Sequence, residues 1–198
     1  MANHNALLRW LGRSTLASLG WTTVGQVPGA DRVVLICAPH TSNWDFVYLL
    51  LISWAQDFDV HWVGKDSLFK PPFGPLMRAL GGISVSRGAK SNQSGQVAEK
   101  MLAAGRLIVA IAPEGTRSAA PHWRSGFYHM AVQGDAVIAL GFLDYASKVG
   151  GFGPPLRPTG DMQADFAKIV EFYRGKVGKF PAQQGPTALS PTSQAVAP

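Results

Sequence analysis

The chain has 198 residues, of which 46% are hydrophobic and only 15% charged, and its formal net charge is +6. This length and apolar content suit one domain with its own core, and its scattered Lys and Arg residues argue against a nucleic-acid-binding stripe and fit anionic lipids or phosphate-bearing substrates. A single cysteine, Cys37, excludes an intrachain disulfide and a cysteine-based zinc site.

Residues 1–21 predict a short amphipathic helix, because leucines alternate there with Arg9 and Arg13, and Trp10 and Trp21 lie near its two ends. Such a helix either rests in a lipid interface or packs on the core. No apolar run reaches the roughly 20 residues that span a bilayer, and the two arginines interrupt the apolar stretch that a secretory signal needs. We therefore expect a cytoplasmic chain that can lie on the cytoplasmic face of a membrane without crossing it.

Continuous apolar runs after this helix predict buried strands. The expected strands are 33–38, 60–63, 82–86, 107–112 and 136–143, and the expected helices are 46–54, 76–80, 91–104, 126–133 and 162–174. Three prolines between 65 and 75 predict a rigid exposed loop, and Gly150-Gly151 predicts a hairpin turn.

This alternation predicts the α/β class, with one domain over residues 22–181 built on a largely parallel sheet flanked by helices. Residues 182–198 are rich in Pro, Gln, Ala, Ser and Thr. Such a composition buries too little apolar surface to order itself, so it predicts a disordered tail.

The stretch from Ala38 to Asp45 connects the first buried strand to a helix and carries His40 just before that helix. Ser42 or Asn43 can cap the helix by accepting a first-turn amide hydrogen bond. Asp45, in the first turn, can reach the imidazole, fix its tautomer and stabilise the imidazolium, so that the other ring nitrogen takes a proton from a hydroxyl. The alternatives are a surface histidine and an aspartate placed by the helix dipole.

A second motif, Pro113 to Arg117, follows the strand at 107–112. Ligands of open α/β sheets collect outside the carboxyl ends of the strands, so the two motifs are expected to share a site. The glycine at 115 lets the backbone approach a ligand, Thr116 offers a hydroxyl, and Arg117 offers a planar fork for a phosphate. Two further cations directly follow strands, namely Lys65 and Arg87.

These residues resemble the glycerolipid acyltransferases, the family that includes lysophosphatidate and glycerol-phosphate acyltransferases. His40 to Asp45 is similar to the family's His-x4-Asp block, Gly81 to Arg87 to its second block, and Pro113 to Arg117 to its Glu-Gly-Thr-Arg block. The order and rough separations agree over about residues 30–145.

The resemblance implies an acyltransferase of phospholipid biosynthesis, in which His40, oriented by Asp45, deprotonates an acceptor hydroxyl that attacks an acyl thioester. It implies a lysophospholipid or related alcohol as acceptor, acyl-CoA or acyl carrier protein as donor substrate, and no further cofactor or metal. Substrate binding is then expected at Glu114, Gly115, Thr116, Arg117, Arg87 and, more weakly, Lys65.

Two other functions stay open on the residues alone. One is a non-catalytic lipid- or membrane-binding protein with the same fold, and the other is a thioester hydrolase that uses water as the acceptor. The chain has neither a Gly-x-Ser-x-Gly nor a His-Glu-x-x-His motif, which argues against the common serine hydrolases and zinc hydrolases. The sequence leaves open the acceptor, the acyl length, the donor and the oligomeric state.

Overall fold

The computed structural model describes residues 6–85 and 92–191, and in it seven strands form one sheet in the order β1-β7-β6-β2-β5-β3-β4. The strands are β1 (Thr22–Val24), β2 (Arg32–Ala38), β3 (His61–Lys65), β4 (Gly82–Val85), β5 (Leu107–Ile111), β6 (Val137–Asp144) and β7 (Val149–Phe152). All pair in parallel except β6 with β7, which are antiparallel. The predicted α/β class and largely parallel sheet are confirmed.

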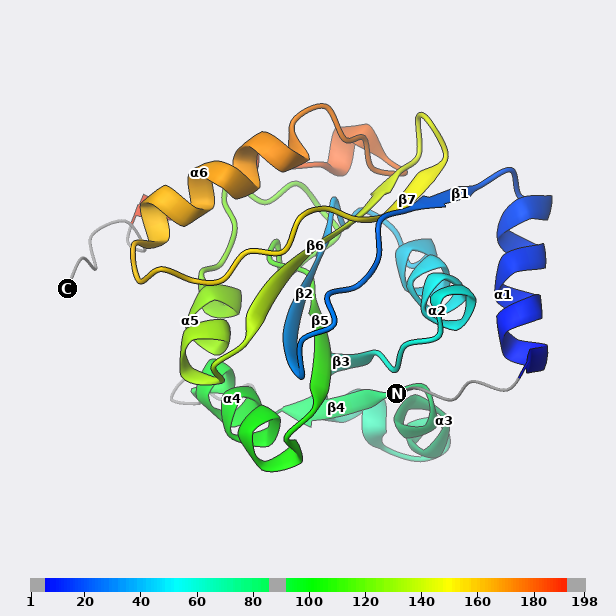
Figure 1. The fold of residues 1–198 in the computed structure, drawn as a ribbon, viewed down its shortest axis with the longest axis horizontal. Helices are drawn as coiled ribbons and strands as arrows, with labels where there is room; N and C mark the ends of the chain where they lie inside the picture. Colours follow the sequence, from blue (N-terminus) through cyan, green and yellow to red (C-terminus); the bar gives the residue numbers. More distant parts are fainter. Residues whose placement is uncertain (1–5, 86–91, 192–198) are drawn as a thin grey trace.

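Helices cover both faces of this sheet (Figure 1). They are α1 (Ala6–Ser18), α2 (Trp44–Gln56), α3 (Gly74–Ala79), α4 (Gln93–Ala104), α5 (Gly126–Gln133) and α6 (Met162–Tyr173), with short 3₁₀ turns at Asp66–Phe69 and Pro181–Gln183. Side chains alternate along a strand, so Val34 and Ile36 of β2 pack with α4, α5 and α6, whereas Val33 and Leu35 pack with α1 and α2. The burial of both faces explains why the central strands are continuous apolar runs.

Helix α1 packs against α2 and also keeps an apolar side in solvent. Gly12 faces the α2 backbone so closely that a Cβ there would lie 2.7 Å from the Leu51 carbonyl oxygen. On the outer side, Leu7 and Trp10 are 66% and 64% exposed. In the described ranges, no helix is both long and apolar enough to cross a membrane.

Three parts of the chain differ from expectation. Strand β1 extends the sheet by pairing with β7, and Gly150 and Gly151 lie inside β7 rather than in a hairpin turn. Gly151 adopts φ 148° so close to Val24 that a Cβ would lie 1.9 Å from the Val24 carbonyl oxygen. Gly151 therefore allows β1 and β7 to approach each other, and residues 145–148 make the turn.

The third difference is the predicted tail, which is ordered over residues 182–191. Leu189 is buried and pairs with Trp123 in an isolated parallel β-bridge. The backbone N–H of Trp123 donates to the Ala188 carbonyl at 2.6 Å. One buried leucine and these backbone bonds hold a segment whose composition is otherwise polar. Residues 192–198 lie outside the described residues.

Candidate active site

The site lies where the parallel strands end. Strand β2 pairs with β5 on one side and with β6 on the other, all in parallel. Their carboxyl ends therefore meet at one edge, which brings His40, Glu114 and Tyr145 together although they are far apart in sequence. The expectation that the first and second motifs share a site is met.

His40 and Asp45 form a hydrogen-bonded pair, with 3.0 Å between His40 Nδ1 and Asp45 Oδ2. The same oxygen accepts the backbone N–H groups of Thr41 and Ser42, each at 3.0 Å. Asp45 lies in the first turn of α2 and is buried, whereas the His40 side chain is 25% exposed at the cleft. With Nδ1 as donor to the carboxylate, Nε2 is left free to accept a proton from a substrate.

Capping of α2 differs in part from expectation. Ser42 Oγ accepts the Trp44 N–H at 3.2 Å, as predicted, but the Asn43 side chain makes no cap bond. Its Oδ1 instead accepts a hydrogen bond from Arg117 Nη1. This bond ties the second motif to the start of α2.

The other Asp45 oxygen is bound by a residue that the sequence motifs do not contain. The Tyr145 hydroxyl donates to Asp45 Oδ1 at 2.6 Å. Tyr145 directly follows β6, so the strand-end rule that pairs the two motifs would have found it, had it been applied to the run 136–143 as well.

Glu114 contacts the backbone of the loop that carries His40. Both of its carboxylate oxygens accept the His40 backbone N–H, at 3.0 and 3.1 Å. Burial raises the pKa of this carboxyl from 4.5 to about 7, against the stabilising hydrogen bond from His40. Glu114 is not among the described residues that line the cleft, so the structure gives it a contact with the His40 backbone where the resemblance suggests contact with the acceptor.

An open cleft of about 540 Å³ adjoins His40. Its polar side chains come from the Glu-Gly-Thr-Arg motif and the loop after it, and from the start of α4: Thr116, Arg117, Ser118, Arg124, Gln93 and Ser94. Its apolar side chains come from α2 and β3: Phe46, Leu49, Trp62 and Val63. The Thr116 hydroxyl accepts the Ser118 N–H at 3.2 Å. A cleft with a cationic wall and an apolar wall can hold a ligand that is itself anionic at one end and apolar at the other.

Arg124 also lines this cleft, beside Arg117 of the Glu-Gly-Thr-Arg motif, but it belongs to none of the sequence motifs. Gly115 has φ 68°, and a Cβ at this position would lie 3.0 Å from Arg124 Nε. The glycine therefore makes room for a guanidinium of the same chain. Lys65 ends β3, but its side chain, like the whole of Arg87, lies outside the described part of the structure.

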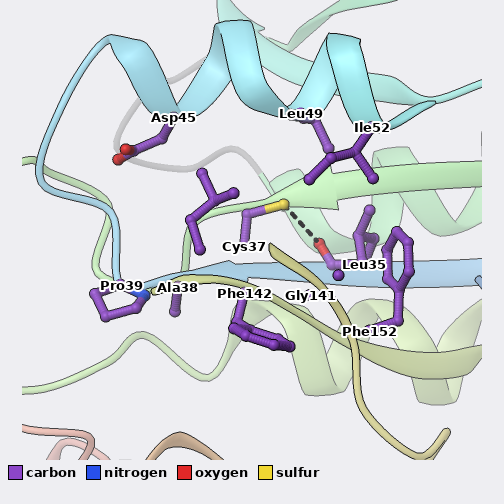
Figure 2. Close-up of a pocket in the computed structure, with 12 residues that line it drawn as sticks. Leu35, Cys37, Ala38, Pro39, Asp45, Leu49, Ile52, Gly141, Phe142 and Phe152 are labelled. Atoms are coloured by element: carbon purple, nitrogen blue, oxygen red, sulfur yellow. Dashed lines mark hydrogen bonds between the residues drawn. The ribbon is translucent and has the colours of Figure 1, made fainter. Parts of the chain in front are cut away.

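A small apolar pocket of about 40 Å³ lies beside Asp45, between α2 and the sheet. Figure 2 shows Leu49 and Ile52 pointing from α2 toward Cys37. Cys37 and Leu49 also line the cleft, so the two spaces adjoin. Burial raises the pKa of the Cys37 thiol to about 12, which keeps it protonated and unsuited as a nucleophile.

Residues 6–85 and 92–191 contain no group of three or more His, Cys, Asp or Glu side chains arranged to hold a metal ion. The chemistry available to the described residues is that of a histidine base held by a buried carboxylate beside two guanidinium groups.

A model of the family described as Acyltransferase matches residues 22–139, a range that includes both motifs. The fold is similar to the crystal structure of the 1-acyl-sn-glycerophosphate (LPA) acyltransferase PlsC from Thermotoga maritima, with a TM-score of 0.56 and 17% identity over 84% of this chain and 74% of that one. No curated protein sequence matches the chain.

Proposed function

The chain belongs to the Acyltransferase family, and we propose that it moves a fatty acyl group from an acyl thioester to a hydroxyl of a glycerophosphate-type lipid. The observation that carries this proposal is the His40–Asp45 pair, whose free imidazole nitrogen opens onto a cleft with one cationic and one apolar wall.

In this mechanism His40 Nε2 takes the proton of the acceptor hydroxyl as its oxygen attacks the thioester carbonyl carbon. Asp45 accepts the Nδ1–H and stabilises the imidazolium that forms. When the tetrahedral intermediate collapses, the carbon–sulfur bond breaks and the imidazolium returns the proton to the leaving thiolate. General-base help of this kind supplies on the order of 10²–10⁴-fold in rate.

The acceptor's phosphate would bind at the cationic wall. Arg117 and Arg124 both line the cleft, and a guanidinium binds phosphate oxygens through two parallel N–H groups. The apolar wall, continued by the small pocket at Cys37, would take the acyl chain. The thiol carrier, whether coenzyme A or acyl carrier protein, would then approach from the open side of the cleft.

The test is release of free thiol from palmitoyl-CoA and from palmitoyl-acyl carrier protein, with lysophosphatidate, glycerol 3-phosphate and uncharged monoacylglycerol as acceptors. We expect His40→Ala to lose on the order of 10²–10⁴-fold in rate. His129→Ala, at an exposed position on α5, is the matched control and should keep full activity. Turnover by His40→Ala close to wild type would contradict the base role, and thiol release that needs no acceptor would favour a hydrolase.

We also propose a peripheral association with the cytoplasmic face of a membrane through the outer side of α1. Leu7, Trp10 and Leu11 are exposed there at helical spacing, and α1 carries two arginines and no acidic residue. This composition suits an anionic lipid surface.

Co-sedimentation with anionic phospholipid vesicles tests the membrane contact. A Leu7→Ser/Trp10→Ser variant should lose most binding, and Leu102→Ser/Val132→Ser, which changes two apolar side chains of α4 and α5 that are also about half exposed, should not. Equal binding by both variants would overturn the assignment of α1.

A further inference from the structure

We infer that Tyr145 is a positioning residue for the His40–Asp45 pair. Its hydroxyl binds Asp45 Oδ1, the oxygen that does not face the imidazole, and so keeps the carboxylate oriented toward His40. The inference rests on the base role proposed for His40. Tyr145 contacts neither the acceptor nor the donor in this account, because it is not among the described residues that line the cleft or the small apolar pocket.

The two oxygens of Asp45 are bound very differently. Oδ2 accepts from His40 Nδ1 and from two backbone N–H groups, whereas Tyr145 is the one donor to Oδ1 within residues 6–85 and 92–191. The terminal torsion of an aspartate is soft and has no sharp staggered minimum. A bond to Oδ1 therefore fixes the rotation of the carboxylate and keeps Oδ2 in front of the imidazole.

Tyr145 is itself held rigidly. Its backbone N–H donates to the Val177 carbonyl at 2.9 Å. Its ring meets Trp21 and Tyr48 edge to face, with centroids 5.0 and 5.8 Å apart. The hydroxyl is thus aimed from a packed ring, and its position does not depend on solvent.

The hydroxyl also stays a donor at any pH at which the protein works. Burial, and then the neighbouring Asp45 carboxylate, raise the pKa of Tyr145 far above 10. A protonated tyrosine beside an ionised carboxylate makes a charge-assisted hydrogen bond, which is about twice as strong as a neutral one.

The chain supplies a matched control in Tyr128. Its hydroxyl donates to the buried Asp165 at 2.9 Å, a second tyrosine–aspartate bond that involves no histidine. Tyr145→Phe and Tyr128→Phe each delete one hydroxyl and keep the ring, so Tyr145→Phe retains its contacts with Trp21 and Tyr48 and Tyr128→Phe retains its place in the core. Both should melt below wild type.

Steady-state kinetics separates the two variants. We expect Tyr145→Phe to lower kcat about 10-fold with KM for donor and acceptor unchanged, because loss of one charge-assisted bond at the pair is worth about one factor of ten. Tyr128→Phe should stay within about two-fold of wild type. A Tyr145→Phe enzyme that keeps its kcat, one that only raises KM, or an equal loss of kcat in both variants would overturn the inference.

A second readout works without turnover, so failure of the proposed reaction and failure of this inference are distinguishable. The low-field proton NMR signal of the His40 Nδ1–H, assigned by its absence in His40→Ala, reports the bond to Asp45 directly. Tyr145→Phe should shift or broaden this signal and Tyr128→Phe should leave it in place. An unchanged signal in Tyr145→Phe would overturn the role of Tyr145 even if no acceptor were turned over.

Discussion

Asp45 and Asp165 have nearly the same surroundings and different consequences. Both are buried, at 7% and 0% exposure, and both lie in the first turn of a helix. Each accepts a tyrosine hydroxyl, and Asp45 accepts two backbone N–H groups where Asp165 accepts one, from Thr159. Asp45 also binds His40, at the edge of the cleft. Asp165 instead binds Lys168, whose side chain is 63% exposed.

This comparison shows that a caged carboxylate is not by itself a sign of catalysis. At Asp165 the cage joins α5, the loop before α6 and α6 itself, so its hydrogen bonds hold elements together. Burial alone would raise the pKa of Asp165, but bonds from Thr159, Tyr128 and Lys168 keep it below its ordinary value of 3.8. Asp45 differs in that an imidazole lies between its carboxylate and the open cleft, which is the feature that the proposed reaction uses.

The largest expected effect comes from replacing each aspartate by asparagine. Asp45→Asn should lower kcat on the order of 10³-fold, because a neutral amide cannot stabilise the imidazolium that forms when His40 takes the proton. Its carbonyl oxygen can keep the bonds from the Thr41 and Ser42 N–H groups, which places the NH₂ group toward the Tyr145 hydroxyl. Thiol release from the acyl thioester measures this loss.

Asp165→Asn is the counterpart and should leave kcat within about two-fold. It should lower the free energy of unfolding by about 3 kcal/mol, since it breaks a buried charged network. The folded pKa of Asp165 lies below its unfolded value, so its contribution to stability is complete above about pH 4 and is lost only as the pH falls further. Urea titrations of both chains across that range check this; a large fall in kcat in Asp165→Asn would break the comparison.

Glu114 is another buried carboxylate, but its hydrogen bonds do not offset the effect of burial on its pKa. Its folded pKa of about 7 exceeds the usual 4.5, so the stability linked to its protonation is complete below pH 4.5 and is lost as the pH rises through 7. This loss is about 3 kcal/mol, since a change of one in pKa corresponds to about 1.4 kcal/mol.

Glu114→Gln removes that titration and keeps one acceptor oxygen for the His40 N–H. Relative to wild type, the variant should therefore gain about 3 kcal/mol in unfolding free energy between pH 4.5 and pH 8. Urea titrations at several pH values measure the difference between the two chains. A difference that stays constant with pH would show that Glu114 is ionised throughout.

The smallest effect is expected at Lys168. Lys168→Met removes the ammonium group that pairs with Asp165 at 3.3 Å. The Lys168 side chain is 63% exposed, so water screens its charge although Asp165 is buried. The free energy of unfolding should therefore change by no more than about 1 kcal/mol. A loss as large as that of Asp165→Asn would show that the lysine, rather than Tyr128 and Thr159, holds this carboxylate.

Continuous apolar runs predicted the central strands because these strands are buried on both faces and are apolar throughout. The helices at 126–133 and 162–174 agree with α5 and α6 to within one residue. The glycine-rich β7 was predicted as a turn because Gly150 and Gly151 carry no side chains to show burial. In the structure, Gly151 lies against the β1 backbone and Gly150 against the side chains of Leu143 and Ile52. The contacts of residues 182–191 were not predicted for a related reason, because a single buried leucine gives no periodic signal.

The amino-acid sequence was enough to predict the class of the fold, the sheet edge at which the two motifs meet and the pairing of His40 with Asp45. Each of these depends on neighbours in the chain or on a strand end, which a local pattern reveals. Only the tertiary structure decided that Glu114 braces the His40 backbone, that Arg124 enters the cleft and that Tyr145 binds the far oxygen of Asp45. These contacts join strands and loops that are distant in sequence, and their geometry is set by packing, which no local pattern encodes.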